Sequence, residues 1–291
     1  MGLEPMETML RKARDGRYAV GAFNLVDYAS ALAIVRAAEE LDAPVIVQTS
    51  VKTVRFWGCA AIVAWMREMA GNSPVPVALH LDHCKDLDVI AQCIAAGWTS
   101  VMIDASAKPF EENLAVTRKV AEMADAAGVS VEAELGEIGG VEDDKNVSDE
   151  AAHLADPDKA EAFCRGLHLP AFAPAIGTAH GVYKGEPRLA FDRLEEIARR
   201  ADVPIALHGG TGLSNEVFRK CIALGCAKIN ISTQIKYAFI DAFVDYHNAH
   251  GEYEPLKPLA AQLDRIKREV AEKITLFGGA GRASANKRGT T

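Results

Sequence analysis

The sequence has 291 residues, of which 49% are hydrophobic and 25% are charged, a composition typical of a globular protein. Its net charge of −8 and its lack of a basic cluster argue against nucleic acid as the main partner and against an anionic membrane surface. No apolar run is long enough to span a bilayer, and the N-terminus, amphipathic and carrying acids, is unlike a signal peptide. The six cysteines form no CxxC pair, so we expect free thiols in a reducing cytoplasm.

Eight short segments rich in apolar or β-branched residues predict β-strands. They span residues 18–24, 43–50, 76–83, 100–106, 130–136, 171–177, 204–210 and 227–233. Most are separated by segments with helical periodicity, such as residues 27–41. Eight alternating strand and helix units predict an α/β protein with a closed (β/α)8 TIM barrel, and a doubly wound open sheet is the alternative.

The chain shows no internal boundary, so we expect one barrel domain over residues 1–285. The basic and polar end at 286–291 has no apolar anchor and predicts a disordered tail. The long, acidic segment 139–163 follows the fifth predicted strand. It is typical of a mobile functional loop followed by a helix.

Three histidines come from three different predicted strands at the end of the barrel that carries the chemistry. His83 ends the third strand, His180 follows the sixth and His208 ends the seventh. Three histidine nitrogens with an open fourth position are a known catalytic zinc arrangement, although a single histidine at a strand end is more often structural. The set predicts a zinc site, with His80 as a candidate partner that orients a ligand.

Acidic residues lie at the same strand ends. Asp82 is placed to exchange a proton with a substrate, or else to orient a histidine. Asp104 and Glu134 could hold the metal ion in another position or support its ligands. Glu142 could close over the site, although the acidic run around it could equally be a solvated loop.

Two glycine-rich segments, "HGVYKG" and "HGGTGLS", each begin with one of the three histidines. Glycine lets backbone N–H groups approach an anion closely, and the loops after strands seven and eight are the usual phosphate site of such barrels. Lys184, Thr211 and Thr233 add donors. After the second strand, Ser50, Lys52 and Arg55 could bind a second, distal anion, or could form an exposed basic surface.

The motifs "AFN", "LHLDH", "SVMIDAS", "EAELGEIGGVEDD", "IGTAHGVYKGEP", "LHGGTG" and "KINIST" occur in this order, followed by "YEPLKPL" and "KITLFGGAGRA". Together they resemble the class II (zinc-dependent) ketose-bisphosphate aldolases, a family that includes fructose- and tagatose-1,6-bisphosphate aldolases. The resemblance runs from about residue 5 to residue 283. It implies a homodimer or homotetramer that acts in carbohydrate metabolism of the glycolytic type.

The resemblance also implies roles for individual residues. His83, His180 and His208 match the zinc ligands, Asp82 matches the acid/base at the C4 hydroxyl, and Glu142 matches the loop glutamate that moves the C3 proton. Asp104 and Glu134 match positions near the alternative metal location. The substrate-binding positions, mostly for the dihydroxyacetone phosphate half, are Asn24, Gly181, Lys184, Gly209, Thr211, Asn230, Ser232 and Thr233. A monovalent cation, Na⁺ or K⁺, near that phosphate is a further family feature.

We therefore expect an aldehyde-lyase that reversibly cleaves a ketose 1,6-bisphosphate to dihydroxyacetone phosphate and an aldehyde. A zinc ion would stabilise the enediolate charge as a Lewis acid. A lysine Schiff base is the other solution, but no lysine ends a predicted strand, because Lys228 lies at the start of the eighth.

Two departures from the family pattern bear on the substrate. Ala107 stands where many members have histidine, and Ser232 replaces an aspartate of some fructose-bisphosphate enzymes, as in the tagatose-type branch. The alternative substrate is a ketose 1-phosphate with another distal anion, such as 6-deoxy-6-sulfofructose 1-phosphate or a deoxy-ketogluconate phosphate. A metal-dependent hydrolase is disfavoured because the first strand ends in Phe23-Asn24 and not in His-x-His. A binding protein without catalysis is disfavoured because Asp82 and the three histidines are all present.

Overall fold

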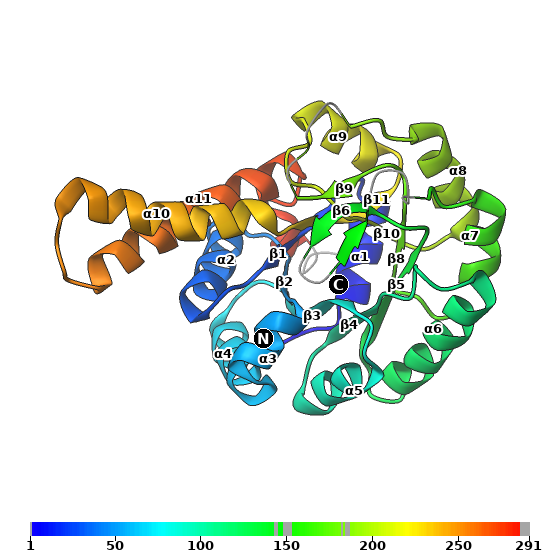
Figure 1. The fold of residues 1–291 in the computed structure, drawn as a ribbon, viewed down its shortest axis with the longest axis horizontal. Coiled ribbons are helices and arrows are strands. Elements are labelled where there is room, and N and C mark those ends of the chain that lie inside the picture. The colour runs from blue at the N-terminus through cyan, green and yellow to red at the C-terminus, as the bar shows by residue number, and fades with distance from the viewer. Residues whose placement is uncertain (1, 143–144, 148–152, 182, 184–186, 286–291) are drawn as a thin grey trace.

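The computed structural model describes residues 2–142, 145–147, 153–181, 183 and 187–285. Eight strands form a closed barrel in the order β1-β11-β10-β8-β5-β4-β3-β2 (Figure 1). Every neighbouring pair is parallel. The strands are β1 (Val20–Asn24), β2 (Val45–Thr49), β3 (Val77–Cys84), β4 (Ser100–Ile103), β5 (Ser130–Leu135), β8 (Ala171–Pro174), β10 (Ile205–Leu207) and β11 (Cys226–Ile231). The predicted closed barrel is confirmed, and the open sheet is excluded.

Helices surround this barrel and cover its outer face (Figure 1). Alternation along β2 shows why: Val45 and Val47 pack with the helices, whereas Ile46 belongs to an inner cluster and Gln48 contacts polar residues inside. The surrounding helices are α2 (Tyr28–Glu40), α3 (Val51–Trp57), α4 (Cys59–Asn72), α5 (Leu87–Ala96), α6 (Phe110–Asp125), α7 (Pro157–Cys164), α8 (Phe191–Ala201) and α9 (Asn215–Ala223).

Helix α1 (Met6–Asp15) closes the end of the barrel at which the strands begin. Its buried Met6, Met9 and Leu10 join an inner cluster with small strand residues such as Ala78 and Ala206. Alanine at these positions leaves room for the methionine side chains. The barrel interior is therefore filled by apolar side chains at the end where the strands begin. The opposite end, where the strands finish, is called the mouth.

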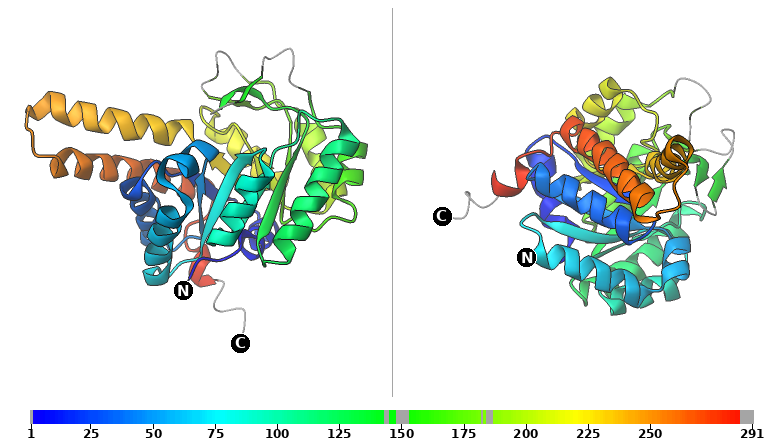
Figure 2. Two further views of the ribbon diagram at one scale, coloured as in Figure 1. Left: turned by 60° about the horizontal axis from the view of Figure 1, so that its bottom comes forward. Right: turned by 90° about the vertical axis from the view of Figure 1, so that its left-hand side faces the viewer.

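A second, three-stranded sheet lies at the mouth, in the order β7-β6-β9. It consists of β6 (Gly139–Glu142), β7 (Lys145–Val147) and β9 (Ala179–His180). Figure 2 shows it at the end of the molecule opposite to the N-terminus. Segment 139–163 thus contains two short strands before α7, where the sequence predicted a loop. Pairing of Gly140 with His180 ties this segment to the histidine loop after β8.

Two long helices, α10 (Thr233–His250) and α11 (Leu256–Leu276), were not among the predicted elements. They pack against each other, and α11 also packs on α2, so that the pair projects from the barrel as an arm (Figures 1 and 2). The short α12 (Arg282–Ala285) follows. The predicted tail at 286–291 lies outside the described residues, and the single-domain assignment of 1–285 stays a prediction.

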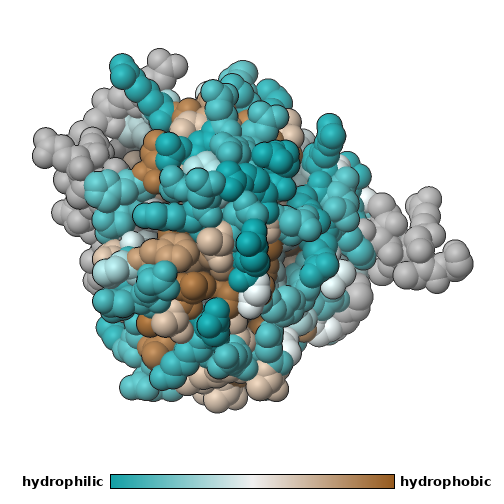
Figure 3. All heavy atoms as spheres, turned by 90° about the vertical axis from the view of Figure 1, so that its right-hand side faces the viewer, coloured by the Kyte–Doolittle hydropathy of each residue, from teal (hydrophilic) through white to brown (hydrophobic). Residues whose placement is uncertain are grey.

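The face that carries α7 and α8 is largely hydrophilic, with an apolar area near its middle (Figure 3). None of the helices in the described part of the chain combines the length and the hydrophobicity that a membrane-spanning segment requires. The six cysteines, all within the described ranges, are free thiols, as predicted.

Candidate active site

The three predicted histidines meet at the mouth of the barrel. His83 lies near the end of β3, His180 on β9 and His208 directly after β10. One ring nitrogen from each lies within 4.8 Å of the other two, and Nε2 of His83 is 2.8 Å from Nδ1 of His208. The ring of His180 stands edge-on to that of His83, with 4.8 Å between their centroids. This cluster could hold a metal ion.

An irregularity in β3 lets two successive residues face the mouth. Neighbouring side chains of a regular strand point to opposite faces, yet Asp82 and His83 both contact residues at the mouth. The pairing of β3 with β4 shifts between Leu81 and Cys84, and His83 has a φ of 46°, which is uncommon for any residue but glycine. This bulge adds a residue to β3 and re-aims its side chains.

The buried carboxylate of Glu132, on β5, fixes the tautomer of His208. Nε2 of His208 donates a hydrogen bond to Oε1 of Glu132 over 2.6 Å, which leaves the lone pair of Nδ1 directed toward His83. Burial lowers the pKa of His208 to about 3, and the Glu132 hydrogen bond offsets this only in part. The ring is therefore neutral at physiological pH, and neutral imidazole is the form that binds metals.

Two further carboxylates lie at His83. Its Nδ1 is 3.3 Å from Oδ2 of Asp104 and 3.6 Å from Oε2 of Glu134. Asp104 is itself fixed, because its Oδ1 accepts a 2.7 Å hydrogen bond from the Ser106 hydroxyl. With Nδ1 facing these acids, Nε2 of His83 faces His208. His83, Asp104 and Glu134 also form a second group that could hold a metal ion.

Asp82 lies beside the histidines with its carboxylate held from both sides. Nε2 of Gln48 donates to Oδ2 over 3.0 Å, and Nδ2 of Asn230 donates to Oδ1 over 3.2 Å. Gln48 also donates to Oδ1 of Asn24 over 2.6 Å. The structure thus brings the predicted Asp82, Asn24 and Asn230 together. Gln48 was not predicted, although it lies near the end of β2 and pairs with Asn24 at the end of β1.

An ion pair lies below the histidines. Nζ of Lys228, on β11, is 2.9 Å from Oε2 of Glu132, and neither side chain is exposed to solvent. Burial alone would raise the pKa of Glu132, but the Lys228 charge and the His208 hydrogen bond outweigh it and hold that pKa well below its ordinary value. The predicted partner His80 lies nearby, its Nε2 3.8 Å from Glu132 Oε2. The sequence analysis missed this pair.

The glycine-rich loops pack closely against each other. Gly209 has a φ of 66°, and a Cβ there would lie 2.5 Å from the carbonyl oxygen of Ala179. The Tyr183 hydroxyl accepts from the Ala179 N–H and donates to the Gly209 carbonyl oxygen. The His180 and His208 loops are therefore tied together at this point. Gly181 also has a positive φ, of 88°.

The remaining predicted residues are placed as follows. Thr233 is the first residue of α10, Ser232 is its N-cap, and Thr211 lies half-buried in the turn after β10. The Ser232 hydroxyl is buried and has no hydrogen-bond partner within the described ranges. Lys184 lies outside the described residues, as does the side chain of Glu142, whose backbone ends β6.

The predicted distal-anion residues start the helix after β2. The Ser50 hydroxyl caps α3 by accepting from the Thr53 N–H. Arg55 is exposed and pairs with Asp86 over 3.6 Å, and Lys52 is exposed. Their role as an anion site stays a prediction.

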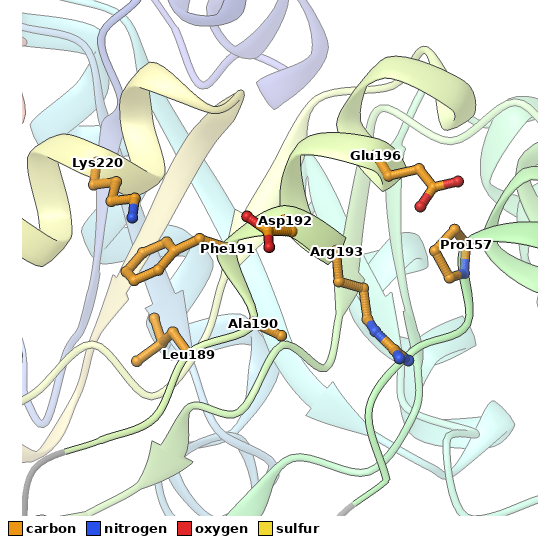
Figure 4. A pocket seen from close by; sticks show the side chains of 8 residues that line it. All are labelled: Pro157, Leu189, Ala190, Phe191, Asp192, Arg193, Glu196 and Lys220. Atoms are coloured by element: carbon orange, nitrogen blue, oxygen red, sulfur yellow. The ribbon is translucent and has the colours of Figure 1, made fainter.

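A pocket of about 520 Å³ lies away from the histidines, at α8 and α9 (Figure 4). On one side of this pocket, the amine of Lys220 lies over the Phe191 ring, 3.8 Å from the ring centroid. None of the predicted site residues lines this pocket. The lining residues are Pro157, Leu189, Ala190, Phe191, Asp192, Arg193, Glu196 and Lys220.

The chain is similar to known proteins over nearly its whole length. Residues 4–282 match the family model described as "Fructose-bisphosphate aldolase class-II". The chain is 42% identical to the fructose-bisphosphate aldolase of Geobacillus stearothermophilus over 98% of its own length and all of the relative's. It is 43% identical to a probable fructose-bisphosphate aldolase of Bacillus subtilis, over 97% of its own length and all of the relative's.

Among solved structures, the YdjI aldolase from Escherichia coli K12 superimposes with a TM-score of 0.86 at 32% identity, over 97% of this chain and 99% of that one. The matches extend across the whole barrel and include every strand that carries a residue of the site. The chain therefore belongs to the class II fructose-bisphosphate aldolase family.

Proposed function

We propose that this chain is a zinc-dependent aldolase that reversibly cleaves a ketose 1,6-bisphosphate, of the fructose or tagatose type, to dihydroxyacetone phosphate and an aldehyde. The observation that carries the proposal is the convergence of three histidine nitrogens beside the buried carboxylate of Asp82. The family to which the chain belongs supports the reaction, and the related aldolases support the substrate.

The residues at the mouth fit a zinc ion. Tetrahedral zinc with Zn–N bonds of 2.0–2.1 Å separates two ligand nitrogens by about 3.4 Å. The nitrogens of His83 and His208 are 2.8 Å apart, so side-chain shifts of well under about 1 Å would accommodate the ion. His83, His180 and His208 would hold it, and Asp104 and Glu134 would offer an alternative position with His83. Bound zinc would supply Lewis-acid stabilisation of the charge on the enediolate oxygen.

Asp82 is the proposed base that takes the proton of the C4 hydroxyl as the C3–C4 bond breaks. Its two amide donors, Gln48 and Asn230, fix the orientation of the carboxylate. Glu142 is the proposed acid that returns a proton to C3, from the segment that β6 joins to the His180 loop. Asn24, next to Gln48, would contact the substrate.

The phosphate of the dihydroxyacetone half would bind where the glycine loops meet the start of α10. Backbone N–H groups at a helix N-terminus attract anions, and the buried Ser232 hydroxyl adds a donor. The proposed residues are Gly181, Lys184, Gly209, Thr211, Asn230, Ser232 and Thr233. A monovalent cation, Na⁺ or K⁺, would accompany this phosphate. Ser50, Lys52 and Arg55 remain the candidates for the distal phosphate.

The assembly and location of the enzyme are also proposals. Exposed Tyr237, Ile240 and Val244 lie along one side of α10, and such an apolar face supports a homodimer or homotetramer. The free cysteines support a cytoplasmic enzyme.

A coupled assay for dihydroxyacetone phosphate tests the proposed reaction. Fructose 1,6-bisphosphate, tagatose 1,6-bisphosphate and 6-deoxy-6-sulfofructose 1-phosphate would be offered to the protein supplied with zinc. Fast release from one of the two bisphosphates is expected. Release from the sulfonate alone would contradict the proposed substrate, and release from none of them would contradict the proposed activity.

A further inference from the structure

Lys228 is a fully buried lysine that the proposed reaction does not use. Its side chain lies inside the barrel with no exposure to solvent. Lysine is almost never fully buried unless it is paired, because an unpaired charge in the interior is costly. Its amine has two partners: it forms an ion pair with Oε2 of Glu132 over 2.9 Å and donates a hydrogen bond to Oδ1 of Asn230 over 2.6 Å.

Glu132 connects Lys228 to His208, a proposed zinc ligand. Glu132 holds the amine of Lys228 with Oε2 and accepts from Nε2 of His208 with Oε1. The lysine thus fixes the carboxylate that selects the His208 tautomer and ring orientation. Carboxylates that hold a ligating histidine commonly have such an effect on metal affinity.

Asn230 connects Lys228 to Asp82, the proposed base. Because the amide oxygen of Asn230 faces the Lys228 amine, its NH₂ group must point the other way, toward Oδ1 of Asp82. A reversed amide would place an oxygen against the carboxylate. The buried amine of Lys228 therefore orients both the carboxylate of Glu132 and the side-chain amide of Asn230.

We propose that Lys228 is a positioning residue that holds the metal ligand His208 and the base Asp82 in a fixed relation through Glu132 and Asn230. The inference rests on the proposed function, since it requires zinc at the histidines and proton transfer at Asp82. The competing explanation is that the Lys228–Glu132 ion pair only stabilises the barrel.

The test compares Lys228→Met, which keeps the length of the side chain but removes its donors, with Lys273→Met. Lys273 is a partly buried lysine on α11 whose amine lies over the Phe218 ring, 5.2 Å from its centroid, and serves as the matched control. Zinc affinity would be measured by competition with a chromogenic chelator, and ligand geometry by the visible spectrum of the cobalt-substituted protein. Lys228→Met should weaken zinc binding by about 10–100-fold and alter the cobalt spectrum, whereas the control should do neither.

A second readout separates positioning from stability. With zinc saturating, Lys228→Met should lower kcat more than it raises KM, because Asp82 loses a fixed donor. The double variant Lys228→Met/Glu132→Gln carries no unpaired buried charge and is used if the single variant does not fold; with zinc saturating, its kcat should be lower than that of Glu132→Gln alone, because Asn230 has also lost the amine that orients it, and an equal kcat would contradict the proposal. The double variant should also bind zinc about 10-fold or more weakly, because a neutral amide replaces the carboxylate behind His208.

The outcomes distinguish the two levels of the proposal. If the wild-type chain binds zinc but a folded Lys228 variant matches its zinc affinity and cobalt spectrum, the positioning role is wrong and the proposed function stands. If the wild-type chain binds no zinc at these histidines, the proposed function fails, and the inference falls with it.

Discussion

The backbone of His83, a proposed metal ligand, adopts a strained conformation. Its φ of 46° is sterically unfavourable for a residue with a Cβ. The bulge between Leu81 and Cys84 that requires this conformation also turns Asp82 and His83 to the same side. A regular strand could offer the mouth only one of them. This strained backbone therefore allows a proposed metal ligand and the proposed base, which are neighbours in sequence, to face the same site.

Replacing Asp82 by alanine tests the proposed base. General acid–base catalysis contributes about 10²–10⁴-fold to rates, so Asp82→Ala should lower kcat by about that factor. Zinc affinity should change by less than about 3-fold, because the three histidines remain. The exposed Asp88, at the start of α5, provides the control Asp88→Ala. Turnover by Asp82→Ala at the wild-type rate would remove the carboxylate from the mechanism.

Gly209 offers a test of the close approach between two loops. A Cβ at Gly209 would lie 2.5 Å from the carbonyl oxygen of Ala179. Gly251 has a similar φ, of 63°, but its Cβ would meet nothing within 4 Å. Gly251→Ala should therefore cost about 1 kcal/mol of unfolding free energy for its backbone strain, and Gly209→Ala about 1–3 kcal/mol more for the clash. Urea unfolding of both variants measures the difference, and equal losses would contradict the assigned contact.

At the scale of elements, the small sheet at the mouth connects two loops that are distant in sequence. β6 follows β5 and pairs with β9, which carries His180. The pairing brings the backbone of Glu142 into the same sheet as His180. The backbone of segment 139–142 and the backbone that holds one of the three histidines therefore belong to one sheet.

His168 forms hydrogen bonds with residues of α1 and α6, and its protonation depends on pH. His168 lies between α7 and β8, with Nδ1 2.8 Å from Oδ1 of Asp125 and Nε2 3.1 Å from Oε1 of Glu7. The hydrogen bond to Asp125 and then that to Glu7 raise the pKa of His168. The protonated form is favoured by folding, so its stabilisation is complete below the unfolded pKa of about 6.5 and is lost as pH rises through the higher folded pKa.

Replacing this histidine should therefore matter more in acid. The loss of unfolding free energy in His168→Gln should be larger at about pH 5.5 than at about pH 9, although it should be modest because the side chain is 47% exposed. Thermal unfolding across this range measures it, with the exposed His153→Gln as the control. A loss that does not vary with pH would contradict the assigned pairing.

The parts of the fold that sequence predicts are those whose signal is local. β2, for example, combines β-branched residues with alternation, so its existence follows from the chain itself. The hairpin of β6 and β7 has no such signal, since Gly139 and Gly140 weaken a strand, and β6 also pairs with β9, which is distant in sequence. The histidine cluster was predictable because a barrel brings strand ends together. Lys228 was missed because its burial and its partner Glu132 depend on the register between distant strands.

At the scale of the whole molecule, the arm formed by α10 and α11 leaves apolar residues exposed. Tyr237, Ile240 and Val244 are spaced by three and four residues, as on one face of a helix. They are 55%, 58% and 47% exposed. An exposed apolar face of this kind favours association, and it supports the proposed pairing with a second copy of the chain.

A charge on this face should disrupt the proposed oligomer. Ile240→Asp should shift the mass measured by light scattering toward that of one chain, because burying the carboxylate in an apolar interface is costly. Asp241→Asn, at the neighbouring exposed position on α10, should leave the mass of the oligomer unchanged. A wild-type protein that is already a monomer at micromolar concentration would contradict the proposal.

The dependence of cleavage on zinc tests the central claim most directly. The protein would be stripped with a chelator, and dihydroxyacetone phosphate release from a ketose bisphosphate would be followed as zinc is added back. The account predicts that stripping abolishes release, and that activity returns in proportion to zinc until the three histidines of each chain are occupied. Release that survives complete removal of metal would contradict a metal-dependent aldolase at this site.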